Sequence, residues 1–158
     1  MTKHCEFRRQ RRSGPGGQHR NKVETGIFVT HTPTGIEAAA TEKRSQLKNR
    51  ETAIERLRVE LAIIFRVPNV NDDGPSQLWQ TRCRNGRIVC SRNHFDFAAI
   101  LAEALDALGA FELDFAQAAE HLGCTRSQLT KLLSMEPAAL THVNRLRAER
   151  GQKPLSPR

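Results

Sequence analysis

The chain is a basic sequence of 158 residues with little aromatic content. Its net charge is +8 and its hydrophobic fraction is 38%, whereas only 5% of its residues are aromatic and none is tyrosine. This length fits one ordinary domain or two small ones, with a core of aliphatic side chains. No apolar run is long enough to span a membrane, and the N-terminus lacks a signal-peptide core, which argues against the membrane and secreted classes. We therefore expect a soluble, cytoplasmic protein.

The positive charge lies in the N-terminal part of the chain. Residues 1–66 carry 14 Lys and Arg residues against 7 Asp and Glu residues, whereas residues 99–158 carry 7 of each. A basic stretch can be only a solvated surface, but it also suits a polyanionic partner whose phosphates the cations neutralise. The N-terminal part is therefore the candidate for binding a polyanion.

The cysteines give no clear metal-binding pattern. Cys5, Cys83, Cys90 and Cys124 include no C-x-x-C pair. Cys83 and Cys90 with His94 loosely suggest a metal site, but a fourth ligand is not obvious and the spacing matches no standard zinc pattern. We predict no metal and no cofactor, and we expect reduced, isolated thiols.

The first predicted domain, residues 1–66, has the pattern of a small α+β unit. A short strand over 5–11 precedes a glycine-rich loop, and residues 26–41 alternate as two strands around a Thr-Pro-Thr-Gly turn. A long helix is predicted over 42–66, with Thr41 as its N-cap. We expect this helix to pack on one face of a small antiparallel sheet. Its apolar residues at helical spacing are Leu47, Ile54, Leu57, Leu61 and Ile64.

The remaining sequence predicts a linker over residues 67–77 and a hairpin with a small helical bundle over 78–158. The linker is inferred from its composition. Asn85-Gly86 is the strongest short turn signal and places the hairpin over 78–91. Four helices are expected after the hairpin, over residues 95–110, 114–123, 125–134 and 137–151.

The second and third of these helices have the spacing of a helix-turn-helix. Thr125 and Gln128 have the spacing of a capping box at the start of the third helix. A DNA-reading function would place Arg126, Ser127, Gln128 and Lys131 at base edges or phosphates. The alternative is a small bundle with the apolar residues in its core, and the neutral charge of the surrounding sequence favours it. These apolar residues are Phe115, Ala118, Ala119, Leu122, Leu129, Leu132 and Leu133.

The segment SGPGGQHRNKVET, residues 13–25, begins with a concentration of glycine. Three glycines and a proline stand within residues 13–17, and the basic sequence Gln-His-Arg-Asn-Lys follows. Glycine costs backbone entropy on folding, so the loop needs a reason for this composition. A simple turn between strands is the alternative, but it would not need so much charge of one sign. A loop that enters a phosphate-lined cavity would need both the charge and the missing side chains.

Residues 5–66 resemble the peptidyl-tRNA hydrolase domain of class I peptide chain release factors. Four segments occur in the family's order and spacing: the Gly-Gly-Gln (GGQ) loop, its Gln-His-x-Asn continuation, the THTPTGI turn and the RSQLKNR helix start. The resemblance implies hydrolysis of the ester between nascent peptide and tRNA in the peptidyl transferase centre. Gly16 and Gly17 would let the backbone enter that site, and Gln18 would be catalytic. Gln18 is also a candidate for methylation, which the family often shows.

The resemblance further implies that the partners are peptidyl-tRNA and the 23S-type rRNA of the large ribosomal subunit. The residues that would contact RNA around the loop are Arg11, Arg12, Ser13, His19, Arg20, Asn21 and Lys22. Those at the start of the helix are Arg44, Ser45, Gln46, Asn49 and Arg50. Helix capping and a solvated first turn are the alternative for this second group. We expect a monomer without membrane or DNA partners.

The chain departs from the family where the stop codon would be read. A decoding release factor has a further domain with short Pro/Ser/Thr-containing tripeptide motifs, and nothing in residues 67–158 resembles them. Only a handful of residues precede the first strand. We therefore expect codon-independent release from stalled ribosomes, with the helical region as a sensor or a stabilising cap. The alternatives are a non-catalytic ribosome-binding homologue and a helix-turn-helix DNA regulator.

Overall fold

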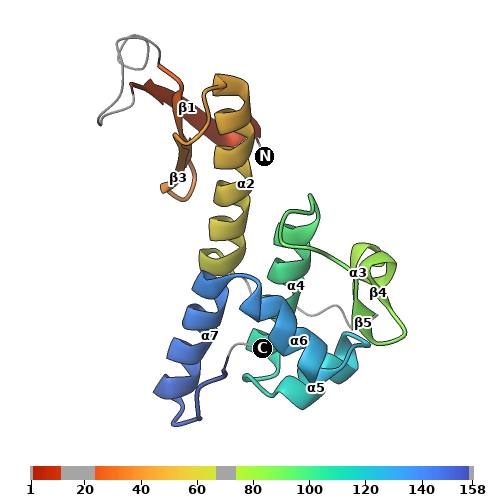
Figure 1. Ribbon diagram of the computed structural model, residues 1–158. Helices are drawn as coiled ribbons and strands as arrows, with labels where there is room; N and C mark the ends of the chain where they lie inside the picture. The colour runs from red at the N-terminus through yellow and green to blue at the C-terminus, as the bar shows by residue number, and fades with distance from the viewer. Residues whose placement is uncertain (1, 12–23, 67–73, 157–158) are drawn as a thin grey trace. The chain divides into compact units, whose positions relative to one another are not determined.

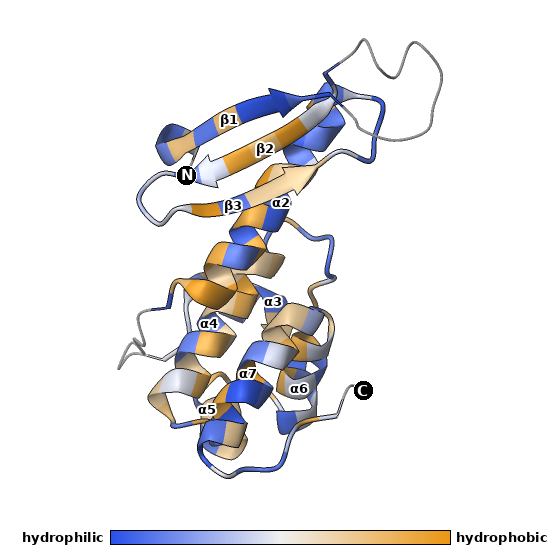
Figure 2. Cartoon of the chain, turned by 90° about the vertical axis from the view of Figure 1, so that its left-hand side faces the viewer, coloured by the Kyte–Doolittle hydropathy of each residue, from blue (hydrophilic) through white to orange (hydrophobic). Residues whose placement is uncertain are grey.

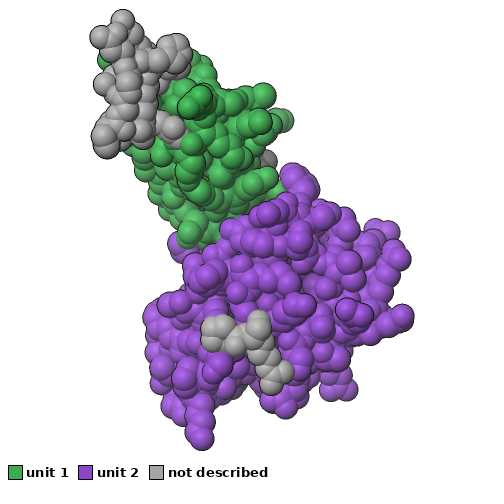
Figure 3. Space-filling model, in the orientation of Figure 1, with its two compact units in different colours: residues 1–61 green, residues 62–158 purple. Residues whose placement is uncertain are grey.

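The computed structural model describes residues 2–11, 24–66 and 74–156 (Figure 1). Its helices and antiparallel strands confirm the predicted α+β class. The chain divides into two compact units, residues 1–61 and 62–158, which Figure 3 shows in green and purple. The division falls inside a single long helix and not after residue 66.

The first unit is a three-stranded antiparallel sheet covered on one face by a helix. After a 3-10 turn, η1 (Thr2–His4), the strands are β1 (Cys5–Gln10), β2 (Gly26–His31) and β3 (Ile36–Ala40), in the order β1-β2-β3. The register pairs Val29 with Phe7 on one side and with Ala38 on the other. The predicted strand over 5–11 and the predicted strand pair over 26–41 are therefore confirmed.

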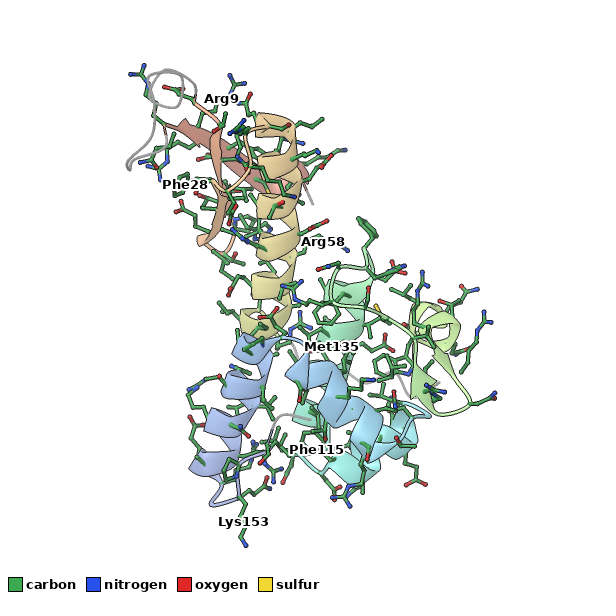
Figure 4. All side chains as sticks on the ribbon, viewed as in Figure 1. Arg9, Phe28, Arg58, Phe115, Met135 and Lys153 are labelled. Carbon is green, nitrogen blue, oxygen red and sulfur yellow. The ribbon has the colours of Figure 1, made fainter. Side chains whose placement is uncertain are left out.

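The core of this unit lies between one face of the sheet and α2 (Gln46–Ile64). Successive side chains of a strand point to opposite faces, so every second residue of β2 faces the helix. Figure 2 shows β2 as largely hydrophobic and β1 as largely hydrophilic. Phe28 lies on the opposite face (Figure 4), with the guanidinium of Arg8 4.9 Å from its ring centre. The buried cluster consists of Ile27, Val29, Ala38, Ala40, Ala53 and Leu57.

Helix α2 begins later than its sequence pattern predicts. Its first residue is Gln46, and the N–H of Lys48 donates to Ser45 Oγ over 3.4 Å, so Ser45 occupies the capping position. The prediction of Thr41 as the N-cap was wrong, because residues 42–44 form a bend between β3 and the helix, which begins at Gln46.

The helix buries only part of the predicted stripe: Leu57 is in the core and Leu61 packs against it. Asn49, Ala53 and Leu57, each four residues apart, have no exposed surface. Leu47 is 64% exposed and Ile64 is 59% exposed, although both belong to the predicted apolar stripe. Residues four apart share a helix face. At the start of the helix, the buried face therefore begins with the polar residue Asn49, whereas the apolar Leu47 lies outside it.

Between residues 74 and 156, the second unit forms a short hairpin and the five helices α3 to α7. The predicted helices after the hairpin are confirmed, with boundaries shifted by a few residues. The hairpin is confirmed only around Asn85-Gly86, where both residues have positive φ, as a two-residue turn requires. The elements are α3 (Gln77–Arg82), β4 (Cys83–Arg84), β5 (Arg87–Ile88), α4 (Phe97–Ala110), α5 (Phe115–His121), α6 (Arg126–Ser134) and α7 (Pro137–Glu149).

Helix α3 replaces the first strand of the predicted hairpin. Ser76 caps it, because its Oγ accepts from the N–H of Trp79 at 3.0 Å. Glu103 on α4 accepts from both the N–H and the hydroxyl of Ser76. Trp79 is 1% exposed, and its Nε1 donates to the carbonyl of Leu122 over 2.7 Å. Burial of Trp79 explains why residues 77–82 form a helix, where the sequence predicted the end of the linker and the first strand of the hairpin.

The α5–α6 pair contributes its apolar faces to the core of the second unit. All seven apolar residues predicted as bundle core are buried. Asp114 and Thr125 cap α5 and α6 through their side chains. The predicted capping box is only half formed, because Gln128 Oε1 accepts from the N–H of Ile88 at 3.2 Å. Gln128 therefore joins the hairpin to α6.

Cys83, Cys90 and Cys124 are free thiols. Burial raises the pKa of Cys124 to about 12 and also raises the pKa of Cys83 and Cys90, which keeps these thiols protonated and weakly nucleophilic at neutral pH. Among the described residues, no group of three or more His, Cys, Asp and Glu side chains could hold a metal ion. Within the same ranges, no helix has the length and apolar character needed to cross a bilayer.

Replacing Trp79 with Phe tests the anchor of α3. The variant loses the indole donor and leaves the carbonyl of Leu122 unpaired in a buried position. We expect the free energy of unfolding to fall by about 1–3 kcal/mol, measured by urea unfolding followed by circular dichroism. The control Val89→Ala, at a position 64% exposed, should change it by less than about 0.5 kcal/mol. Equal effects of the two variants would contradict the anchoring role.

Candidate catalytic loop and its anchoring residues

The glycine-rich loop joins β1 to β2, and its ends are described although its centre is not. Gln10, the last residue of β1, is paired with Gly26, the first residue of β2. The loop therefore leaves and re-enters the sheet at one point. The predicted site residues within 12–23, outside the described residues, are Arg12, Ser13, Gly16, Gly17, Gln18, His19, Arg20, Asn21 and Lys22.

Gly26 allows the chain to close at the base of the loop. A Cβ at this position would lie 2.9 Å from the carbonyl oxygen of Gln10 and 3.1 Å from Cγ2 of Thr41. Contacts this short would force the strands apart. Close packing therefore explains the glycine here, in contrast to the left-handed turn that explains Gly86.

Arg11 and Glu24 form an ion pair just outside this closure, with 3.4 Å between Arg11 Nε and Glu24 Oε1. Their side chains are 68% and 47% exposed, so the pair contributes about 0–1 kcal/mol. The guanidinium of Arg11 remains accessible to solvent. Its position at the foot of the loop is compatible with the predicted RNA contact.

Asn49 is the buried polar residue that holds the loop to the helix. Its Nδ2 donates to the carbonyls of Thr25 at 2.6 Å and Lys43 at 2.9 Å, and its Oδ1 accepts from the N–H of Lys43 at 2.9 Å. Asn49 has no exposed surface. The interpretation of Asn49 as an RNA contact does not fit this burial, because its amide is bonded to the backbone on both sides. It joins the end of the loop, the bend before α2 and α2 itself.

The other residues predicted at the helix start have separate surroundings. Ser45 caps α2, Gln46 is half-buried, and Arg44 is exposed. Arg50 is exposed, and its guanidinium lies 4.4 Å from the centre of the Phe7 ring. This cation–π contact on the surface leaves the N–H groups of Arg50 available to an outside acceptor. Arg44 and Arg50 are therefore the members of this group most accessible to an external acceptor.

A second interaction fixes the bend between β3 and α2. Arg56 Nη2 lies 2.5 Å from Glu42 Oε1, and Arg56 Nη1 donates to the carbonyl of Ala39. Backbone hydrogen bonding at Glu42 lowers the pKa of its carboxyl, and Arg56 lowers it further. The bend is therefore tied both to β3 and to the third turn of α2.

The predicted site residues include none from β1, although its arginines belong to the basic sequence that precedes the loop. Phe7, Arg8 and Arg9 are all exposed on this edge strand. Phe7 lies under Arg50 and Arg8 lies over Phe28. The basic run adjoins the loop in the sequence, and the pairing of β1 with β2 decides the face of each side chain: Phe7 lies on the α2 face of the sheet and Arg8 on the opposite face. Exposed arginines thus lie on β1 and at the start of α2, the two elements that adjoin the loop.

Residues 1–79, half of the chain, match the RF-1 domain. The chain belongs to the RF-1 domain family. This confirms the resemblance to class I peptide chain release factors drawn from the GGQ loop, the THTPTGI turn and the RSQLKNR helix start. The RF-1 match covers the whole first unit and extends as far as Trp79.

The chain is similar to curated peptide chain release factors over part of its own length. Peptide chain release factor 1 of Ureaplasma parvum is 53% identical over 51 residues, which are 32% of this chain and 14% of that protein. Peptide chain release factor 1 of Malacoplasma penetrans is 55% identical over 51 residues, with the same shares. The chloroplastic peptide chain release factor PrfB1 of Arabidopsis thaliana is 38% identical over 81 residues, 48% of this chain and 18% of that protein. The chain thus spans less than a fifth of these relatives.

Replacing Asn49 with Ala tests whether its hydrogen bonds hold the end of the loop, the bend and α2 together in the RF-1 domain. The variant leaves the carbonyls of Thr25 and Lys43 and the N–H of Lys43 without their side-chain partner. One unpaired buried group costs about 1–3 kcal/mol. We therefore expect the free energy of unfolding, measured by urea unfolding, to fall by at least this amount. Leu47→Ala, two residues earlier at a position 64% exposed, should change it by less than about 0.5 kcal/mol. If Asn49→Ala were as stable as the wild type, the hydrogen bonds of Asn49 would not be what holds the unit together.

Proposed function

We propose that this RF-1 domain protein hydrolyses the ester bond of peptidyl-tRNA on the ribosome and so releases the nascent peptide. The observation that carries the proposal is the Gly16-Gly17-Gln18 sequence inside the RF-1 match, between strands paired at Gln10 and Gly26. Its curated relatives are named peptide chain release factors. Asn49 supports the proposal, because it ties the end of this loop to the helix that carries the second basic group.

Gln18 is the proposed catalytic residue. A water oxygen attacks the ester carbonyl carbon, the bond to the tRNA 3′ oxygen breaks, and the peptide leaves with a new carboxyl while the 3′ oxygen takes a proton. The backbone N–H of Gln18 would donate to the developing oxyanion or to the leaving oxygen. Its side chain would place the water and exclude other nucleophiles, and methylation would help to fix that side chain. Gly16 and Gly17 would keep the approaching backbone free of side chains.

The proposed partners are peptidyl-tRNA and the rRNA of the large subunit, met by a monomer in the cytoplasm. The described cations that support this proposal are Arg11, Arg44 and Arg50, which are exposed around the base of the loop. Phosphate contacts of this kind release counterions, so binding should weaken with salt. Ser45 and Gln46 at the helix start complete the described part of the proposed RNA-facing surface. The loop residues proposed to contact RNA are Arg12, Ser13, His19, Arg20, Asn21 and Lys22.

We further propose that release does not require a stop codon, so that stalled ribosomes are the substrate. Residues 67–158 carry no segment that resembles the family's codon-reading tripeptide motifs. From residue 74 to 156, this region forms the helical unit built on α3 to α7. A sensor for the stalled state is the role that we propose for this unit.

Two substitutions at Gln18 test the catalytic assignment. Gln18→Pro removes the backbone N–H, and losing one preorganised donor of this kind should slow release by about 100- to 1000-fold. Gln18→Ala keeps the N–H and should slow release less. Peptide release from ribosomes with labelled peptidyl-tRNA and an empty decoding site measures both, with binding to the ribosome as the control. Wild-type rates in both variants would exclude a catalytic Gln18 and leave a non-catalytic ribosome-binding protein.

Ribosomes in different states test the codon-independent proposal. We compare peptide release from ribosomes that hold an empty decoding site, a sense codon or a stop codon, at equal protein concentration. Release from the empty site without a stop codon is the expected result, because no codon contact is required. Release that occurs only with a stop codon would contradict rescue while leaving the hydrolytic activity intact.

A further inference from the structure

Two arginines face each other across the hairpin of the second unit. Arg84 on β4 and Arg87 on β5 are cross-strand partners, and Asn85-Gly86 forms the turn between them. The φ angles of 50° and 73° at the turn are those of the tight hairpin turn that follows the twist of the strands. Directly paired residues lie on the same face of a hairpin, so the two guanidinium groups extend from one face. Both side chains are exposed.

The two arginines differ from their neighbours in having no carboxylate partner among the described residues. Arg82 pairs with Asp96 at 2.7 Å, and Arg92 pairs with Glu136 at 2.7 Å. No described carboxylate lies within ion-pair distance of Arg84 or Arg87. Like charges placed directly opposite each other weaken a strand pair. The stability of the fold therefore does not explain this pairing, whereas an external anion between the two guanidinium groups would.

Hydrogen bonds to α6 and to its N-cap residue Thr125 hold the hairpin that carries the two arginines. On its other face, Cys83 and Ile88 are half-buried, and the N–H of Ile88 donates to Gln128 on α6. The N–H of Thr125 donates to the carbonyl of Gly86 at 3.3 Å, which joins the turn to the start of α6. Val89, two residues beyond Arg87, is 64% exposed. Arg84, Arg87 and Val89 are defined here as the arginine face.

We propose that the arginine face binds backbone phosphates of RNA. A guanidinium matches a phosphate with two parallel hydrogen bonds, and two guanidinium groups side by side suit successive phosphates of one strand. That the RNA belongs to the ribosome rests on the proposed function. The arginine face would give the second unit its own contact with the ribosome, separate from the catalytic loop.

Removal of both arginines tests this contact in the full-length protein. We measure the cosedimentation of Arg84→Ala/Arg87→Ala with purified ribosomes over a series of KCl concentrations. We expect at least about tenfold weaker binding at low salt and a slope of log K against log salt that is smaller by about 1.4–1.8, the value for two lost phosphate contacts. Arg84→Lys/Arg87→Lys should bind between the wild type and the alanine variant, because it keeps the charge without the paired donors.

A charge-matched variant supplies the control. Arg150→Ala/Lys153→Ala removes the same charge from exposed positions after α7 and keeps the backbone carbonyl of Lys153 that accepts from Arg147. It should bind ribosomes as the wild type does. Equal affinity and salt slope in the two alanine variants would overturn the proposal. Urea unfolding at low salt distinguishes a folding defect, because loss of the like-charge pair should leave the midpoint unchanged or raised.

The two proposals fail in distinguishable ways. Gln18→Pro should bind ribosomes normally and release little peptide, whereas the arginine variant should approach the wild-type release rate once it saturates the ribosomes. A photoreactive residue at position 89, Val89→p-benzoylphenylalanine, identifies the partner. A crosslink to the ribosome that ribonuclease destroys supports RNA. A crosslink that ribonuclease leaves intact and protease destroys would overturn RNA in favour of a ribosomal protein.

Discussion

The amide of Asn49 is the interaction on which the geometry of the first unit depends. It bonds to Thr25 at the end of the loop and to both backbone groups of Lys43 in the bend before α2. Each of these backbone groups would cost free energy if it were buried without a partner. Only a short side chain with both a donor and an acceptor can satisfy them together. The position of the loop base relative to the basic start of α2 therefore follows from one residue.

The second unit also depends on a hydrogen bond between a buried side chain and the backbone, which here anchors α3. Trp79 brings a large apolar surface into the core together with one N–H, and the carbonyl of Leu122 satisfies it. The side chains of Glu103 and Gln128 likewise accept hydrogen bonds from the backbone, at the start of α3 and at the end of β5. These bonds fix the hairpin without using the arginines at its turn. A rigid support with free cations is what a phosphate-binding surface requires, and the like-charge pair at the turn is then functional.

Much of the fold could be predicted because local signals and packing agree. The Asn85-Gly86 turn, the caps of α5 and α6, and the apolar faces that form the bundle core all depend on neighbours within a few residues. The predictions were wrong where a distant contact decided the outcome. Trp79 is buried in the helix formed by residues 77–82, and the buried face of α2 starts at Asn49, whereas Leu47 is exposed. Neither contact has a signal in the local pattern.

The sequence by itself determined the family and the candidate chemistry. The GGQ tripeptide, its basic continuation and the spacing of the later segments are properties of residue order, and the RF-1 match rests on the same order. Only the tertiary structure decided which polar residues are available. It buried Asn49, used Gln128 for the hairpin, exposed Arg50 over Phe7 and set Arg84 opposite Arg87. The reason is physical: a side chain binds an external partner only with hydrogen-bonding groups that the folded chain has not already used, and contacts distant in sequence decide which these are.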